Sequence, residues 1–153
     1  MNILKYLKNQ YKYAVKDKCE EPGTNCTLSL KDLDKYIVLK GEEVQPRQSI
    51  CDCIVFVEKE AVIAGVIELK SKTVDVSKVM QQLTNGLKFV FEAIKDSDIN
   101  SHLMKIYVVV LAKKWRKHEY DIIKKKKILM YGKKYLILPK RCGIYFSEII
   151  SKF

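Results

Sequence analysis

Residues 2–17 and 76–95 each place mainly apolar side chains at intervals of three and four, the spacing of one helix face. The positions in the first segment are Ile3, Tyr6, Leu7, Gln10, Tyr11 and Ala14. Those in the second are Val76, Val79, Met80, Leu83, Leu87, Val90 and Ile94. The spacing predicts two amphipathic helices. The Pro-Gly pair at 22–23 predicts a turn after the first, and Thr73 or Asp75 is the expected N-cap of the second.

Short runs rich in Val, Ile and Leu predict the strands. A first strand is expected at 35–40. The runs 50–58 and 62–70 are separated by only three residues, so they predict a hairpin. The run 105–112 is apolar without alternation, which is typical of a strand covered on both faces and indicates pairing parallel to 62–70.

A strand, a helix and a parallel strand form a crossover unit, so the predicted fold class is α/β. We expect a mixed central sheet, made of an antiparallel meander and a βαβ unit, flanked by helices. The 153 residues fit one domain, with a core over about 1–112 and a basic part over about 113–153. In the basic part, two more short strands are expected around a turn at Gly132.

Composition argues for a folded chain and against a membrane protein. Hydrophobic residues make up 48% of the chain, yet no apolar run approaches the roughly 18 residues that cross a bilayer. The first 18 residues alternate Lys with apolar side chains and lack the unbroken apolar region of a signal peptide. We therefore expect a cytoplasmic protein.

The cysteines are odd in number and include no CxxC pair. This pattern predicts reduced, mostly buried thiols rather than a disulfide framework. The alternative is a zinc or iron-sulfur site built from Cys19, Cys26 and Cys142. The other two cysteines are Cys51 and Cys53.

Three charged residues lie within or at the edges of the two apolar runs of the predicted hairpin. Side chains two apart on a strand share a face, so Glu68 and Lys70 project from the same side of the sheet. If residues 59–61 form the connection, Glu58 pairs with Val62 and the same register places Asp52 directly across from Glu68. Two carboxylates about 4.5–5.5 Å apart repel unless a cation lies between them.

A divalent cation would relieve this repulsion. Mg²⁺ prefers oxygen ligands and keeps several waters, so Asp52, Glu68 and one backbone carbonyl suffice. Lys70 could then orient or deprotonate a metal-bound water for attack on phosphorus. The alternative is that these are surface charges, with Lys70 paired to Glu68. Acids within such apolar strands are costly without a role, which favours metal-dependent phosphodiester hydrolysis.

These residues resemble the motif of the PD-(D/E)xK nuclease superfamily, which shares the restriction-endonuclease-like fold. The matching segments are "CD" at 51–52, "ELK" at 68–70 and "QQL" at 81–83. The resemblance implies that Asp52, Glu68 and the carbonyl of Leu69 hold Mg²⁺ or Mn²⁺ and that Lys70 serves the attacking water. It also implies a catalytic role for a Gln on the following helix, which is Gln82, with Gln81 the alternative.

The chain departs from the superfamily pattern at three places. Cys51 stands where the motif name has Pro, and Gly86 stands where some branches carry Tyr. Many members carry an additional ligating Glu on the first helix. Here only Glu20 and Glu21 lie near that position in the sequence, at the end of the predicted helix, and neither is assigned.

The net charge of +11 is concentrated in the last third of the chain. Twelve basic side chains accompany only two acidic ones between Lys113 and Arg141, giving +10 there and +1 elsewhere. A basic block of this kind indicates a polyanionic partner, and the lack of a wide apolar face favours nucleic acid over a membrane surface. The residues expected to bind it are Lys113, Lys114, Arg116, Lys117, Lys124, Lys125, Lys126 and Lys127.

Aromatic residues lie among these cations. Trp115 and Tyr120 could stack on bases, or Trp115 could belong to the core. His118 is expected to be a surface or packing residue. We therefore predict a Mg²⁺-dependent endonuclease that cuts DNA rather than RNA and acts as a homodimer, since one small chain supplies one active site. The alternative is a nucleic-acid-binding or scaffold module of the same fold with an idle site.

Overall fold

The computed structural model describes residues 2–70, 74–97 and 104–151. Their largest unit is a seven-stranded mixed sheet in the order β1-β4-β5-β6-β7-β9-β8. Its strands are β1 (Val15–Lys16), β4 (Tyr36–Lys40), β5 (Cys53–Glu58), β6 (Val62–Lys70), β7 (Met104–Ala112), β8 (Lys127–Met130) and β9 (Lys133–Arg141). A separate two-stranded sheet pairs β2 (Cys19–Glu20) with β3 (Thr27–Leu28).

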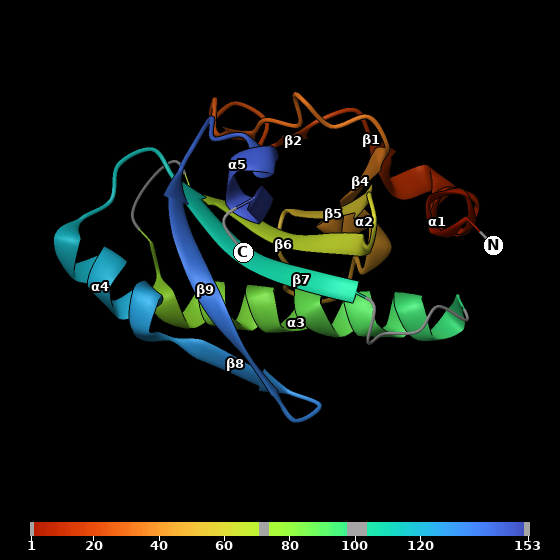
Figure 1. The fold of residues 1–153 in the computed structure, drawn as a ribbon. Helices are drawn as coiled ribbons and strands as arrows, with labels where there is room; N and C mark the ends of the chain where they lie inside the picture. Colours follow the sequence, from red (N-terminus) through yellow and green to blue (C-terminus); the bar gives the residue numbers. More distant parts are fainter. Residues whose placement is uncertain (1, 71–73, 98–103, 152–153) are drawn as a thin grey trace.

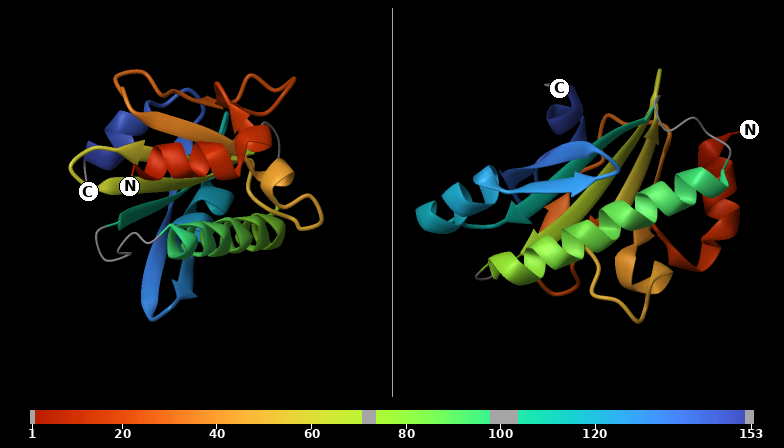
Figure 2. Two further views of the ribbon diagram at one scale, coloured as in Figure 1. Left: turned by 90° about the vertical axis from the view of Figure 1, so that its right-hand side faces the viewer. Right: turned by 90° about the horizontal axis from the view of Figure 1, so that it is seen from below.

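The helices are α1 (Ile3–Gln10), α2 (Gly41–Val44), α3 (Val76–Asp96), α4 (Lys117–Lys125) and α5 (Phe146–Ser151), with a 3₁₀ turn at Lys12–Ala14. Apolar side chains of α1, α3 and α4 pack in one core, on the sheet face that carries Ala64 and Val66. The β2–β3 sheet and α5 cover the other face, which carries Ile67 and Leu69. Figure 1 shows α3 below the sheet and α5 above it, and the right-hand view of Figure 2 looks onto α3.

The predicted meander and crossover are confirmed. β4, β5 and β6 are antiparallel neighbours, and β6 pairs with β7 in parallel along its full length after the crossover through α3. Glu58 pairs with Val62 and Cys53 pairs with Ile67, which is the predicted register. The fold is therefore α/β with a large mixed sheet flanked by helices.

The second predicted helix is confirmed as α3. Its N-cap is Asp75, whose carboxylate accepts a hydrogen bond from the Lys78 amide at 3.2 Å. The other candidate cap, Thr73, lies outside the described residues. The hairpin around Gly132 is also confirmed, as β8 and β9.

The first predicted helix is too long. α1 ends at Gln10, where the Tyr11 amide closes the last turn on the Leu7 carbonyl at 2.9 Å. The chain then extends so that Val15 can pair with Leu39 at the sheet edge. Strand pairing with a distant segment therefore overrides a locally helical pattern.

The prediction of reduced thiols is wrong. Cys19 is bonded to Cys53 and Cys26 to Cys142, which leaves Cys51 as the one free cysteine of the chain. Cys26 and Cys142 are joined to each other, so the alternative metal site with Cys19 is not formed either. The spacing of cysteines in the sequence does not reveal which of them the fold brings together.

Candidate active site

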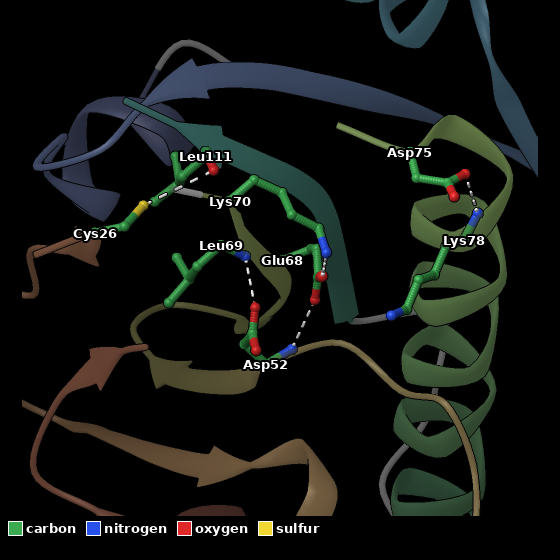
Figure 3. Close-up of polar contacts among 8 residues, drawn as sticks. All are labelled: Cys26, Asp52, Glu68, Leu69, Lys70, Asp75, Lys78 and Leu111. Atoms are coloured by element: carbon green, nitrogen blue, oxygen red, sulfur yellow. Dashed lines mark hydrogen bonds and ion pairs between the residues drawn. The ribbon is translucent and has the colours of Figure 1, made fainter. Parts of the chain in front are cut away.

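Asp52, Glu68 and Lys70 meet at the carboxyl end of β6. The Asp52 amide donates to Glu68 Oε1 at 3.1 Å, and Asp52 Oδ2 accepts from the Leu69 amide at 2.7 Å. Lys70 Nζ lies 2.9 Å from Glu68 Oε2. Figure 3 shows this chain of contacts running from Leu69 through Asp52 and Glu68 to Lys70.

Asp52 precedes β5 rather than lying within it, so the predicted strand 50–58 begins three residues late, at Cys53. Two contacts hold this approach to the strand. The Gly41 amide of α2 donates to the Asp52 carbonyl at 2.9 Å, and the Cys51 amide donates to the Gln82 carbonyl of α3 at 3.1 Å. Asp52 therefore meets Glu68 through a side-chain contact instead of a strand pair.

Glycine allows both of these close contacts. A Cβ added at Gly41 would lie 1.8 Å from the Cys51 carbonyl oxygen. One added at Gly86 would lie 2.5 Å from Cys51 Sγ and 2.7 Å from Val66 Cγ1. Gly86, which stands where some superfamily branches have Tyr, thus lets α3 approach the segment that carries Asp52.

Glu68 is the most buried charged residue of the site, with 1% of its surface exposed. Burial, and next the Asp52 carboxylate, raise the pKa of Glu68 to about 8, while Lys70 acts in the opposite direction. An acid in this position is short of positive charge, because Lys70 alone does not offset burial and a neighbouring carboxylate. The ion pair with Lys70 that the surface-charge alternative expected is present, but it is not on the surface.

Asp52 and Glu68 are the residues that could hold a divalent ion. Asp52 Oδ2 already accepts a hydrogen bond from the Leu69 amide, and Glu68 Oε2 already has Lys70 Nζ as a neighbour. Two carboxylates suit Mg²⁺, which keeps several waters. Among residues 2–70, 74–97 and 104–151, no group of three or more His, Cys, Asp and Glu side chains is arranged to hold a metal.

Gln82 lies beside the site on α3, and the structure distinguishes it from Gln81. Gln81 is exposed, whereas the side-chain oxygen of Gln82 is buried without a hydrogen-bond partner among the described residues. A buried amide oxygen without a partner costs about 1–3 kcal/mol. Gln82 Oε1 can therefore accept a hydrogen bond from a bound water or substrate.

Glu21 is one of the two acids that the sequence left unassigned, the other being Glu20. It lines a cavity of about 450 Å³ together with Glu20, Lys18, Lys40 and Asp52. Burial, then Asp52, raise the pKa of Glu21, and Lys70 lowers it, so its charge is within electrostatic range of the site. Glu21 arrives from the segment after β2 rather than from the first helix, and no pattern in the sequence reveals that placement.

The basic residues divide between two places. Lys113 and Lys114 follow β7 at the site's edge of the sheet, since Ala112 pairs with Lys70 and the Lys113 amide contacts the Lys70 carbonyl. Arg116 caps the start of α4, and Lys117 is its first residue. The last turn of α4 holds Lys124 and Lys125, followed by Lys126 and by Lys127 at the start of β8.

Trp115 has a structural role. Its indole N–H donates to the Lys140 carbonyl at 2.7 Å, and its ring packs edge-on against Tyr120. Both residues are half-buried, so neither presents a free ring for stacking on a base. His118 is exposed, as predicted.

Comparison of the chain with protein-family models, with curated proteins and with solved structures finds no match. No helix within the described ranges is both long and apolar enough to cross a membrane.

Proposed function

We propose that the protein is a Mg²⁺-dependent endonuclease with a restriction-endonuclease-like fold that hydrolyses phosphodiester bonds of DNA. The observation that carries this proposal is the buried carboxylate of Glu68, in contact with the Asp52 amide on one side and Lys70 on the other. Burying such a group is expensive, and a cluster with a raised pKa at the end of a strand is typical of a functional site.

Asp52 and Glu68 would hold Mg²⁺, which when bound neutralises charge that develops on the phosphate and lowers the pKa of bound water. Lys70 Nζ, which lies 2.9 Å from Glu68 Oε2, would orient the attacking water by a hydrogen bond. Gln82 Oε1, buried without a described partner, accepts a second hydrogen bond from that water. The Leu69 amide keeps the Asp52 carboxylate oriented.

The substrate follows from charge. Lys113 and Lys114 lie next to Lys70 and would contact the phosphates that flank the cleaved bond. Cutting both strands of a duplex calls for a homodimer, because one chain supplies one site. A cytoplasmic location is part of this proposal. Burial of Cys19, Cys26 and Cys53 would protect both disulfides there from reducing agents.

A second candidate is a nucleic-acid-binding module with an idle site. The Lys70–Glu68 ion pair favours it, because the pair satisfies Glu68 Oε2 without a metal. The two candidates differ in a single property, which is cleavage.

The test is cleavage of DNA and RNA substrates with Mg²⁺, Mn²⁺ or EDTA. We expect Asp52→Ala and Lys70→Ala to lower the cleavage rate at least 100-fold and to leave binding in EDTA within about threefold of the parent. Asp52→Ala would remove a ligand of the catalytic metal, and a group that acts on the attacking water, such as Lys70, contributes about 10²–10⁴-fold. Asp34→Ala and Lys105→Ala are the matched controls, as both residues are exposed and distant from β6's carboxyl end. Unchanged cleavage by both site variants would refute the proposal, and binding without cleavage by the parent would favour the idle module.

A further inference from the structure

The β8–β9 hairpin forms a two-stranded ribbon, Lys127–Arg141, that extends beyond α3. Its turn is Tyr131–Gly132, and both residues have positive φ, 49° and 79°. Positive φ at both central residues is the conformation of a tight two-residue turn that matches the twist of the flanking strands. Figures 1 and 2 show the turn protruding past the helix that covers this side of the sheet.

One face of the ribbon is fixed to the molecule. Ile128 and Ile137 are buried in the core on the α3 side of the sheet. Phe91 of α3 packs edge-on against Tyr131 and Tyr135, with ring centroids 4.9 and 6.2 Å apart. The ribbon is thus held in place before any partner binds.

The other face of the ribbon is outward. Alternation along the paired strands places Lys127, Leu129, Lys134 and Leu136 on it. Leu129 is 68% exposed and Leu136 is 57% exposed, and Tyr131 at the turn is 72% exposed. Large apolar side chains this exposed, between lysines on a rigid surface, indicate a binding face.

The positive charge of the ribbon and its flanking residues indicates which kind of partner it binds. Residues 122–145 contain eight Lys or Arg and no acidic residue. Within the described residues, none of these eight side chains forms an ion pair. Two copies of the ribbon laid face to face would bring their lysines together, which is unfavourable. A polyanion is therefore the partner that this face fits.

We propose that the outward face of the β8–β9 ribbon enters the major groove of B-form duplex DNA. This inference rests on the proposed function and names its substrate class. The major groove, about 12 Å wide, admits a two-stranded ribbon, whereas the deep, narrow groove of A-form RNA does not. Lys127 and Lys134 contact phosphates, and Leu129 and Leu136 contact the apolar thymine methyl groups of the groove floor.

The ribbon would contribute to DNA binding and take no part in cleavage, because it lies away from Glu68. Glu68 pairs with Val110, which pairs with Pro139, and Leu136 precedes Pro139 by three residues. At about 3.3 Å per residue the outward face begins roughly 10 Å from the level of the site. It also belongs to the sheet face opposite the one that carries Glu68. Duplexes must therefore extend at least about three base pairs from the cleaved bond to reach both.

The experiment measures binding in EDTA by fluorescence anisotropy, with a 20-base-pair DNA duplex, the RNA duplex of the same sequence and single-stranded DNA. We expect the parent protein to bind duplex DNA about tenfold more tightly than duplex RNA. Leu129→Ser/Leu136→Ser should remove most of this preference. Lys127→Ala/Lys134→Ala should weaken binding and lower the slope of log affinity against log salt by about two. All four residues are exposed, so both variants should keep the parent's melting temperature.

The matched control is Lys8→Ala/Lys12→Ala, two exposed lysines of the α1 region, which should leave preference and slope unchanged. Equal affinity of the parent for duplex DNA and duplex RNA would overturn the inference. The inference would also be overturned if the leucine variant bound duplex DNA like the parent but was a monomer by light scattering where the parent is a dimer. The exposed leucines would then form a contact between two copies of the chain. A cleavage assay separates this inference from the proposed function. If the ribbon variants lose duplex binding but Asp52→Ala cleaves like the parent, the proposed function is wrong and the ribbon is still the DNA-binding face.

Discussion

Glu68 is an acid placed where an acid is costly, and its position is held by two named contacts. The Asp52 amide and Lys70 Nζ each contact one of its oxygens. The strand rules that put Glu68 and Lys70 on one face are local, so the sequence was enough to predict this pair. The register was predicted correctly from Cys53 onward, but the strand pair expected between Asp52 and Glu68 is not formed, because β5 begins only at Cys53 and the Asp52 amide contacts the Glu68 side chain instead.

The raised pKa of Glu68 predicts how stability depends on pH. In EDTA, the folded protein holds a proton on Glu68 up to about pH 8, while the unfolded chain releases it near 4.5. The native state then binds more protons in this window, so the free energy of unfolding should fall as pH rises from about 5 to 8. The slope is at most about 1.4 kcal/mol per pH unit. Urea unfolding at several pH values measures it.

The matched variant is Glu68→Gln, which keeps the shape of the side chain and removes its titration. Its stability should fall less over the same pH range, with the contribution of Glu21, whose pKa is also raised, remaining. If the variant and the parent show the same slope, another group causes the pH dependence and the environment assigned to Glu68 is wrong.

Glu21 shows the limit of residue-level prediction. It reaches the cavity beside Asp52 because β2 and β3 form a small sheet of their own, and because Cys19 is bonded to Cys53. Neither the two-residue strands nor the pairing of cysteines has a pattern that a single sequence reveals. Glu21 follows β2 and does not lie on α1, so a Glu on the first helix is not what borders this cavity.

Elements defined by long, periodic runs were predicted well. α3, β6 and β7 each have an apolar pattern long enough to identify them, and their order determined the crossover. The short elements α2, α4 and α5 were not predicted, since four to nine residues carry too little periodicity. α1 was predicted too long, because the helical spacing of apolar residues continues past Tyr11 whereas the helical backbone ends at Gln10.

The packing of α3 on the sheet makes a second prediction. Gly86→Ala should raise helix propensity by about 1 kcal/mol, yet we expect net destabilisation of about 1–3 kcal/mol because the new methyl group overlaps Cys51 Sγ and Val66. Adding Cys51→Ala should recover part of this loss by removing the sulfur. Chemical denaturation of the two single variants and the double variant measures the coupling.

Lys88→Ala is the control for helix propensity, as this residue is exposed on the same helix. A Gly86→Ala variant that is more stable than the parent would show that α3 can move away from Cys51. Cleavage should then be measured as well, because the Cys51 amide is bonded to Gln82 in the site.

At the scale of the whole molecule, the two disulfides connect distant parts of the chain. Cys26 and Cys142 are 116 residues apart, and Cys19 and Cys53 are 34 apart. Closing loops of this size stabilises a fold by about 2–5 kcal/mol each. We expect a dithiol reductant to lower the denaturation midpoint of the parent, and a variant with Ser at all four positions to be less stable and insensitive to it. A midpoint unaffected by reductant would contradict these bonds.

The uneven charge of the whole chain makes a final prediction. Replacing Lys124, Lys125, Lys126 and Lys127 with Ala should weaken binding to nucleic acid and lower the salt slope by up to about four, since each lost phosphate contact removes about one. All four side chains are exposed, so stability should change little. Affinity measured between 50 and 200 mM salt tests this. A slope equal to that of the parent would exclude this run from the interface.

The bond between Cys26 and Cys142 also has a mechanical meaning. Every strand from β3 to β9 lies within the loop that this bond closes, because all of them lie between its two cysteines. A tensile load applied at residues 2 and 151 would be carried by the sulfur–sulfur link, and only the short segments outside it could lengthen. β1 lies outside this link and could be pulled away from β4, but the segments that carry Asp52 and Glu68 could not be drawn apart until that covalent link was cut.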